Sequence, residues 1–452
     1  MIKRIIKILF SFLLIYSTAV PIFAIQHEHK FEIIKEPTCI CSGKKECKTC
    51  GKTVKINKLG HYYQNCSCTR CDSIIGIDER SKTIILTRDV YHGLGLPQSG
   101  EVIIPEKVSW KNSEYTVVGI GCSLFYENTE ITSVVLPKTI EHIQEYAFNQ
   151  CENLTHCNLP EGLKSIHMAA FQCCYNLRDI EFPSTLQWID NFAFNHCNNM
   201  TDSSIVLPQN IKRIGDNIAY PAHMFYDCGT ENFTEFCLHD NPYGYVVRDG
   251  ILYARNGKTL VSIPRAKTFE NNTYVMPDTV VNLGELSFSR NPNIHTVIIS
   301  DNLKINGQMN CDEIHSYNNI GNPLSVACYV YSNVSEYHTK STNPNYISIE
   351  GILYTKDKKH VVAVPNKYSG DINIPEGVIA WNKEALWTDA EDHKDIAFLN
   401  ISSIQLPSSI IDIDEEQIQT INFLVNYYGT QLHINSNNPV YTVGADGLIT
   451  KK

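Results

Sequence analysis

Hydrophobic residues in the middle of the chain recur with a fixed step of 23 residues. Four columns carry this step, and they hold isoleucine, Ala-Phe, cysteine and an apolar residue that precedes proline. Their members are Ile143, Ile166 and Ile189; Ala147-Phe148, Ala170-Phe171 and Ala193-Phe194; Cys151, Cys174 and Cys197; Leu136, Leu159 and Phe182. A period of this length is typical of a solenoid, in which each coil buries its apolar face against the next coil.

Within each coil, one segment alternates apolar and polar residues as a β-strand does. It reads ITSVVLP from Ile131 to Pro137, and later copies read LTHCNLP, LRDIEFP, IHTVII and ISSIQLP. We expect Ile131, Val134 and Leu136 to face inward, because alternate side chains of a strand point to opposite faces. In the next copy, the inward positions are Leu154, Cys157 and Leu159. The pattern predicts a mostly β solenoid with coils of about 23 residues.

A second, longer repeat is inserted between the coils. NPYGYVVRDGILYARNGKTLVSIP (241–264) matches NPNYISIEGILYTKDKKHVVAVP (343–365), and a clipped copy, NPVYTVGADGLITKK, ends the sequence. Each full copy contains two β-rich runs around a turn such as RNGK or KDKK, which predicts a β-hairpin.

Three phrases carry a specific family resemblance: LPKTIEHIQEYAFNQCENL, FPSTLQWIDNFAFNHCNNM and NPNYISIEGILYTKDKKHVVAVP. With these phrases, the chain resembles the BspA-type leucine-rich repeat family from about Ile103 to Lys452. The resemblance implies a leucine-rich-repeat solenoid in a secreted or surface-attached protein that takes part in adhesion. The coils after Ile294 are irregular, and their boundaries stay open.

The first 24 residues have the layout of a secretory signal peptide, with a basic head (Lys3, Arg4 and Lys7), an apolar core and Ala24 before the cleavage point. An uncleaved anchor helix is the alternative, because the apolar run approaches membrane-spanning length. After cleavage we expect no membrane span and a secreted or cell-surface protein. Losing three positive charges would change the formal net charge from −10 to −13, which argues against nucleic acid as a partner.

Seven of the 17 cysteines lie between residues 39 and 71, and four of them have the C-x₂-C-x₁₇-C-x₂-C spacing of a zinc ribbon. The candidate ligands of a structural Zn²⁺ are Cys47, Cys50, Cys68 and Cys71, with Cys39 and His61 as alternatives. Disulfides are the competing interpretation, because the segment is short and the compartment oxidising, and a redox C-x-x-C pair is a third. The segment also resembles a small module often placed before such repeats, which implies a metal-binding or disulfide-stapled fold through His29, Cys39, Cys47, Cys50 and His61. We expect no other cofactor to be required.

These patterns divide the chain into six parts. They are a signal peptide (1–24), a Cys/His-rich module (25–72), a lead-in β segment (73–118), regular leucine-rich repeats (119–240), a hairpin with irregular repeats (241–342), and a hairpin with C-terminal repeats (343–452).

Cys151 is the residue that most suggests catalysis, because His142, His156 and His167 are close to it in the sequence. A nucleophilic cysteine needs a base within hydrogen-bond reach and a third group that orients the base. However, Cys151 has equivalents at Cys174 and Cys197 with different neighbours, and an enzyme does not need one nucleophile per coil. We therefore expect a buried ladder of cysteines that pack as small apolar residues.

We predict a non-catalytic protein that binds an extracellular protein or glycan through the outward strand positions of its coils. These positions are Thr132, Ser133 and Val135; Thr155, His156 and Asn158; Arg178, Asp179 and Glu181. One alternative is a structural spacer or wall-associated scaffold that displays the N-terminal module. A second is a secreted enzyme with an unrecognised site in the irregular segment 302–332. The oligomeric state stays open.

Overall fold

The computed structural model describes residues 31–35, 43–47, 53–56, 63–64, 67–68, 77–78, 80–200, 203–215, 228, 232–284, 287–288, 291–304, 333–382, 385–386 and 400–452. The chain forms two compact units, Met1–Ile77 and Asp78–Lys452. The first unit contains a three-stranded antiparallel sheet of β1 (Phe31–Lys35), β2 (Gly43–Cys47) and β3 (Thr53–Ile56). It also contains an antiparallel pair, β4 (Tyr63–Gln64) and β5 (Ser67–Cys68).

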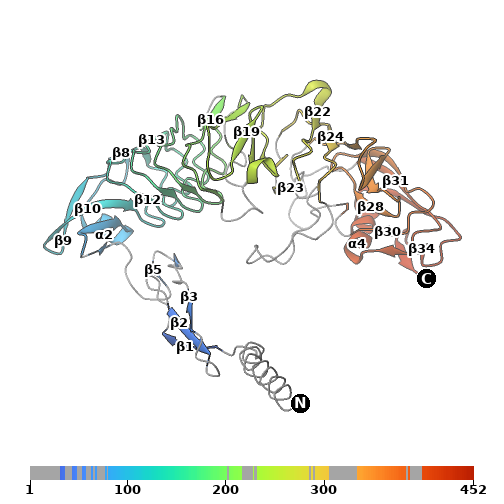
Figure 1. Ribbon diagram of the computed structural model, residues 1–452, viewed down its shortest axis with the longest axis horizontal. Coiled ribbons are helices and arrows are strands. Elements are labelled where there is room, and N and C mark those ends of the chain that lie inside the picture. The colour runs from blue at the N-terminus through green and yellow to red at the C-terminus, as the bar shows by residue number, and fades with distance from the viewer. Residues whose placement is uncertain are drawn as a thin grey trace, which may run out of the picture. The chain divides into compact units, whose positions relative to one another are not determined.

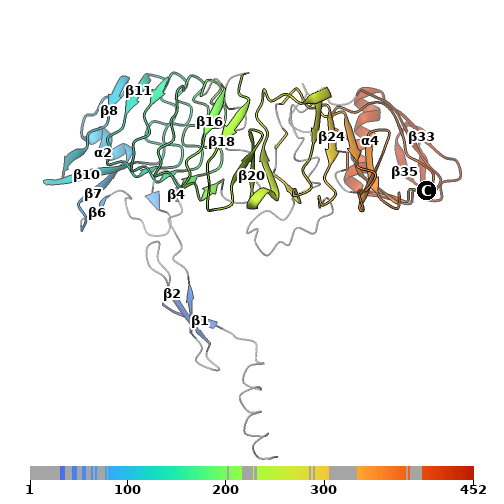
Figure 2. The same cartoon turned by 45° about the horizontal axis from the view of Figure 1, so that its top comes forward.

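The second unit is a solenoid whose coils are joined by parallel strand pairs, as the repeats predict (Figures 1 and 2). Four of the five predicted strands, ITSVVLP, LTHCNLP, IHTVII and ISSIQLP, lie in or overlap strands on one side, which we call the first ladder. In β11, Ile131 and Val134 are buried while Thr132 and Val135 are exposed, so the predicted inward and outward faces are confirmed there. The first ladder consists of β8 (Gly100–Ile103), β11 (Ile131–Val135) and β13 (His156–Cys157); β16 (Ser204–Val206) and β18 (Glu235–Cys237); β22 (Thr273–Val275), β24 (Thr296–Ile299) and β25 (Glu336–Thr339); β29 (Ser369–Asn373), β31 (Asn400–Leu406) and β33 (Gln431–Ile434).

A second ladder runs along the isoleucine column, where the sequence pattern did not predict strands. Most of its strands are two residues long, and the strands of the regular coils place one buried isoleucine beside the next: Ile120, Ile143, Ile166, Ile189 and Ile214. The second ladder consists of β6 (Ile77–Asp78), β7 (Thr83–Leu86), β10 (Ser113–Ile120), β12 (His142–Ile143), β14 (Ser165–Ile166), β15 (Trp188–Ile189) and β17 (Arg213–Ile214), with β9 (Lys107–Trp110) antiparallel to β10; later β21 (Thr259–Ser262) and β23 (Asn282–Leu283); and β28 (His360–Ala363), β30 (Ala380–Trp381) and β32 (Asp412–Ile413).

The Ala-Phe and cysteine columns form a third side that contains turns instead of strands. Here the N–H groups of Tyr146, Phe148 and Gln150 donate to the carbonyls of the next coil at 3.0, 2.7 and 2.8 Å. Tyr146 and Gln150 have left-handed backbone with φ of 57° and 60°, and the same two positions of the neighbouring coils are left-handed as well. Every second N–H along this side, at Tyr146, Phe148 and Gln150, therefore points at the next coil. We call this arrangement the turn ladder, and it is as regular as a strand pair.

Phenylalanine rings from successive coils stack in the core behind the turn ladder. The rings of Phe125, Phe148, Phe171 and Phe194 follow one another with centroids 5.2, 5.0 and 5.3 Å apart and planes within 10°. All four side chains are buried. The predicted Ala-Phe corner is therefore a continuous aromatic column, to which each coil adds one ring.

Each full copy of the long repeat is a three-stranded meander, whereas the sequence predicted a single hairpin. The additional turn is tight, with left-handed Asp249 (φ 48°) and Gly250 (φ 69°) in one copy and Glu350 and Gly351 in the other. The Gly250 carbonyl accepts from Phe236 N–H at 2.9 Å, so this turn continues the first ladder. The strands are β19 (Val246–Arg248), β20 (Ile251–Ala254) and β21; β26 (Tyr346–Ile349), β27 (Ile352–Thr355) and β28; and, for the clipped copy, β34 (Tyr441–Val443) and β35 (Ile449–Lys451).

Short helices complete the second unit. Asp414 caps α4 (Glu415–Phe423) by accepting from Glu416 N–H, and Glu415 and Glu416 lie in the first turn, where carboxylates are favourable. A π-helical turn, η5 (Leu424–Tyr428), follows α4 and ends at left-handed Gly429. The other helices among the described residues are α2 (Arg88–Gly93) and the 3₁₀ turns η2 (Arg255–Gly257) and η3 (Glu270–Asn272).

Replacing one ring of the aromatic column should destabilise the solenoid strongly. We expect Phe171→Ala to lower the free energy of unfolding by about 3–5 kcal/mol, because it leaves a cavity between two stacked rings. Met168→Ala, in the same coil but at a partly exposed position, should change the free energy by about 0.5 kcal/mol or less. Denaturant unfolding, monitored by circular dichroism, measures the free energy of unfolding of both variants. Equal losses would contradict a large contribution of the aromatic column to stability.

Candidate binding surface

The structure places all nine predicted partner-binding residues on the outer side of the first ladder or of its continuation. Seven are exposed, whereas Ser133 and Asn158 are partly buried. Strand pairing puts Ser133 beside His156, and Val134 beside Cys157 beneath them. A register shift between Ile131 and Ser133 explains how two consecutive residues, Thr132 and Ser133, both avoid the core.

The prediction of a third strand, at LRDIEFP, is wrong. Residues 177–183 form no strand, because Asp179 has left-handed backbone with φ of 54°, which breaks the extended conformation. Arg178 N–H still donates to the Thr155 carbonyl at 3.0 Å, so this coil stays attached to its neighbour. Leu159 is also not fully inward as predicted, because its side chain is partly exposed.

Two of the nine side chains hold neighbouring coils together. The Asn158 amide donates to the Leu136 carbonyl at 3.0 Å and accepts from Leu136 N–H at 2.7 Å. The Thr155 hydroxyl donates to the Thr132 carbonyl at 2.9 Å. A partner would compete with these bonds at Asn158 and Thr155, so the other positions are better suited to recognition.

The cysteine ladder is a packing feature. Cys151, Cys174 and Cys197 are fully buried, and each thiol donates to the carbonyl of the phenylalanine one coil earlier, at 3.0 to 3.1 Å. Burial raises the pKa of the Cys151 thiol to about 12 and raises the pKa values of the other two well above the ordinary range. A thiol that stays protonated at neutral pH is a poor nucleophile.

Polar side chains on the outer face of the second ladder form a chain of hydrogen bonds that the sequence did not suggest. Ser165 Oγ lies 2.7 Å from His142 Nδ1 and 2.9 Å from His167 Nε2. His167 Nδ1 lies 3.1 Å from Asp190 Oδ2, and the other Asp190 oxygen pairs with Arg213. His167 and Arg213 hold the pKa of Asp190 below its usual value despite the opposing effect of burial.

Ser165, His167 and Asp190 are hydrogen-bonded to one another in the same sequence as the Ser, His and Asp of a serine-hydrolase triad. Their surroundings, however, are those of a network that holds coils together. Ser165 is only 1% exposed and lies in β14, between two paired strands. Its backbone N–H already donates to the Glu141 carbonyl, and the next residue pairs with Ile143. A substrate therefore has no direct access to Ser165, and the N–H of Ser165 is not free to stabilise an oxyanion.

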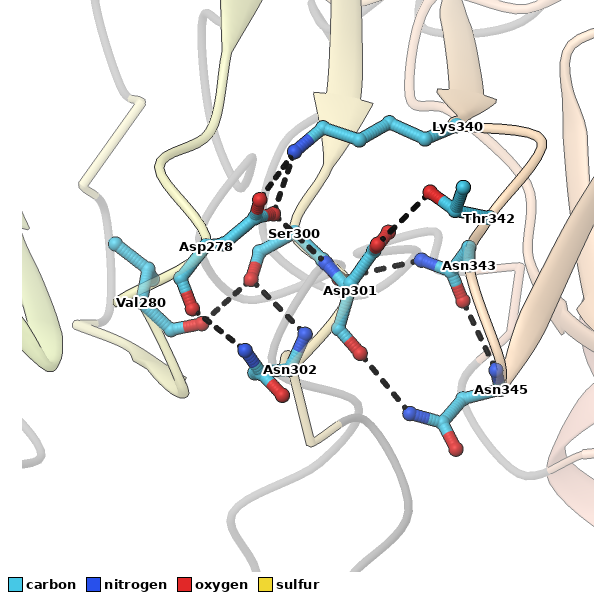
Figure 3. A network of polar contacts seen from close by, with 9 residues as sticks. All are labelled: Asp278, Val280, Ser300, Asp301, Asn302, Lys340, Thr342, Asn343 and Asn345. Atoms are coloured by element: carbon cyan, nitrogen blue, oxygen red, sulfur yellow. Dashed lines mark hydrogen bonds and ion pairs between the residues drawn. The ribbon is translucent and has the colours of Figure 1, made fainter.

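A second polar network joins the coils on either side of residues 305–332 (Figure 3). Lys340 Nζ pairs with both carboxylate oxygens of Asp278 at 2.6 Å, and this contact lowers the pKa of Asp278. Asn302 N–H donates to Ser300 Oγ at 3.1 Å, and the Asn302 amide donates to the Asp278 carbonyl at 2.8 Å. Of the segment considered for an unrecognised enzyme site, residues 305–332 lie outside the described residues, and Asn302 has this structural role.

The proposed metal module is described only through its strand backbone. Cys47 ends β2 and Cys68 lies in β5. Cys39, Cys50, His61 and Cys71 lie outside the described residues, as do residues 1–24, so both zinc ligation and the signal peptide stay predictions. Within the described ranges, no group of three or more His, Cys, Asp or Glu side chains could hold a metal ion. Nor is any helix in those ranges long and apolar enough to cross a membrane.

Comparisons with known proteins fit these repeats. The profile of the BspA type leucine rich repeat region matches residues 118–236 in six copies, which confirms the resemblance over that segment. No curated protein sequence matches the chain. A leucine rich cell surface protein from Faecalibacterium prausnitzii A2-165 has a similar solved structure, with 16% identity, a TM-score of 0.43, and coverage of 84% of this chain and 96% of that one.

Two further solved structures are similar to the chain. The pneumococcal vaccine antigen PcpA has 13% identity and a TM-score of 0.40, and the alignment covers 90% of this chain and 99% of PcpA. A leucine rich repeat protein of T. pallidum has 23% identity and a TM-score of 0.31, with 49% and 77% covered.

The burial of the cysteine ladder predicts selective alkylation. We expect iodoacetamide to modify Cys173, which is partly exposed, and to leave Cys151, Cys174 and Cys197 unmodified in the folded protein. All four should react in denaturant, which serves as the control. Peptide mass spectrometry measures the modification, and a fast-reacting Cys151 in the folded state would contradict a packing role.

The partly buried side chain of His142 predicts how stability depends on pH. Burial, and secondly the nearby His167, lower the pKa of His142 below its ordinary 6.5. As the pH falls through 6.5, the unfolded chain takes up a proton here before the folded chain does, so the free energy of unfolding should decrease. We expect His142→Gln to flatten this decrease between about pH 7.5 and 5.5, and the same substitution at the exposed position His156 serves as the comparison. Denaturant midpoints across that range measure the slope, and an unchanged slope in His142→Gln would rule out this residue as its source.

Proposed function

We propose that this chain, whose residues 118–236 are BspA-type leucine-rich repeats, is a non-catalytic secreted or cell-surface protein that binds another macromolecule. Its partner is an extracellular protein or glycan, and the outer face of the first ladder takes part in binding. The carboxylate-rich composition and the net charge of −10 make nucleic acid an unsuitable partner.

The observation that carries this proposal is the contrast between the two faces of the first ladder. Inward positions stay apolar from coil to coil, as the stacked core requires: Ile131, Leu154 and Leu177 occupy one such column and are fully buried. Outward positions differ: Val135, Asn158 and Glu181 occupy one column, and Ser133, His156 and Asp179 another. A stacked backbone holds these different groups one strand spacing apart, which gives a large, pre-organised surface.

Two further features support a binding role outside the cell. Of the arrangements that most suggest catalysis, the cysteine ladder is buried, and the Ser165–His167–Asp190 chain has a buried serine and hydrogen bonds satisfied within the fold. The signal-peptide pattern at residues 1–24 favours export. Buried thiols with raised pKa values resist oxidation, so free cysteines in the solenoid are compatible with an oxidising compartment.

The test is direct binding of the full chain to a panel of purified extracellular matrix proteins and glycans, measured by surface plasmon resonance. We expect the combined substitution of Ser133, His156, Arg178 and Glu181 by alanine to weaken binding at least tenfold, about 1.4 kcal/mol. A matched control variant carries alanine at four positions on the third side, the side that contains the turns. It should leave binding unchanged, and its positions are Gln150, Met168, Gln172 and Tyr175.

The alternative of a structural spacer makes a different prediction. If the first-ladder substitutions have no effect and deleting Ile25–Asp72 abolishes binding, the solenoid only displays the N-terminal module. Binding that needs neither region would contradict both interpretations. Circular dichroism of each variant confirms that the solenoid is still folded.

A further inference from the structure

Two exposed aromatic residues lie close together on the side of the second ladder. Trp188 in β15 is 38% exposed, and Tyr243, which precedes β19, is 48% exposed. Lys212 links them, because its Nζ lies 5.9 Å from the centre of the Trp188 ring and 5.4 Å from that of Tyr243. Together with Arg213, whose side chain is 47% exposed, these residues form what we call the aromatic–lysine patch.

Hydrogen bonds hold the backbone around the patch in place, so the positions from which its side chains project are defined. Lys212 and Arg213 both donate their N–H groups to the Gln187 carbonyl, at 2.8 and 3.1 Å. The Asn241 amide donates to the carbonyl of Ile211 at 2.7 Å and accepts from Tyr243 N–H at 2.9 Å. This bridge fastens the turn that carries Tyr243 onto the last regular coil.

The turn that contains Tyr243 lies where the next regular coil would otherwise be. Ile214 N–H donates to the Tyr245 hydroxyl at 2.9 Å, where a further strand of the second ladder would have offered a carbonyl. The same device recurs in the clipped copy, where Ile413 N–H donates to the Tyr441 hydroxyl at 2.9 Å. There, however, the residue after proline is Val440, and in the middle copy it is Asn345. The exposed tyrosine is thus a property of the first copy alone.

The patch is locally cationic on a strongly acidic chain. Arg213 pairs with Asp190, which also accepts from His167, and Lys164 pairs with Glu141 at 2.7 Å. Lys212 contacts the two rings and, among the described residues, pairs with no carboxylate. With a net charge of −10 over the whole chain, an ammonium between two exposed rings selects for a partner that carries negative charge.

We propose that the aromatic–lysine patch is an anchor site for an acidic segment of a protein partner. A partner carboxylate would pair with Lys212, and its apolar side chains would pack against the exposed parts of Trp188 and Tyr243. Tryptophan, tyrosine and arginine are the residues that most often dominate the binding energy of protein interfaces.

A protein segment fits better than an acidic sugar. Sugar rings would stack on the aromatic faces, but the Lys212 ammonium already lies over one face of each ring. A flexible acidic side chain can approach that ammonium without displacing it. The proposal rests on the proposed function, since it assumes a macromolecular partner, but it assigns binding to a different face of the solenoid.

The experiment uses the full chain and a random copolymer of glutamate and tyrosine as a defined acidic, aromatic polypeptide. We expect saturable binding by biolayer interferometry that weakens as salt increases. Lys212→Gln and Trp188→Ala should each weaken it at least tenfold. Tyr243→Asn, which introduces the residue of the middle copy and keeps the turn sequence, should weaken it severalfold.

Matched controls separate the patch from general surface effects. Lys138→Gln removes an exposed lysine, and Tyr427→Ala removes an aromatic residue that is 60% exposed, both far along the sequence from the patch. Neither should change binding. Circular dichroism and the denaturant midpoint of every variant exclude unfolding as the cause of a loss.

Three results would overturn the proposal. They are the absence of saturable binding to the copolymer, binding that the patch substitutions do not affect, and binding of hyaluronan that depends on the same residues, which would make this a glycan site. The failure of the proposed function is distinguishable. If the first-ladder variants lose binding to the extracellular panel, while the patch variants keep it and bind the copolymer as strongly as the unsubstituted protein does, the proposed function stands and this inference fails.

Discussion

The fold of the second unit depends on the hydrogen bonds that run from the backbone of one coil to the backbone of the next. On the turn side, three such bonds join each pair of regular coils, although two residues per coil must adopt left-handed backbone, as Tyr146 and Gln150 do. A left-handed non-glycine residue costs about 1 kcal/mol, and each bond contributes about 1 kcal/mol. The Phe148–Phe171 stack and the burial of both rings add several kcal/mol more, so the stacked arrangement is favoured.

The sequence predicted the parts of this architecture that repeat in residue type. The 23-residue step located the coils, the strand face of β11 and the buried cysteines, because a shared core requires the same residue at the same place. It did not predict the second ladder, since strands such as Ser165–Ile166 are too short to show an alternating pattern. It also misassigned residues 177–183, where the left-handed backbone of Asp179 cannot be read from an apolar alternation.

The candidate surface was predictable as a face but not residue by residue. Polar outward residues in the sequence include both surface groups and groups that hold coils together, and only the structure separates Asn158 from His156. A sequence signal existed for one such group. Asn153, Asn176 and Asn199 keep the 23-residue step, and each amide donates to a carbonyl of the preceding coil at 2.9 to 3.0 Å. A polar residue that keeps the period is therefore more often a structural clamp than a recognition residue.

The same reasoning distinguishes the residues that look catalytic from those that can bind a partner. Ser165 and His167 are two residues apart in one coil, and the second ladder brings Asp190 of the next coil beside His167, so proximity alone gives little information about chemistry here. The accessibility of a side chain gives more information about what it can do. Ser165 is sealed between neighbouring strands, whereas Trp188, one coil further along the same column, remains exposed. The first long repeat then ends the run of regular coils and sets Tyr243 beside Lys212 and Trp188. An insertion into a repeat thus creates a surface that regular coils cannot form, because its residues are free of the core's requirement to repeat.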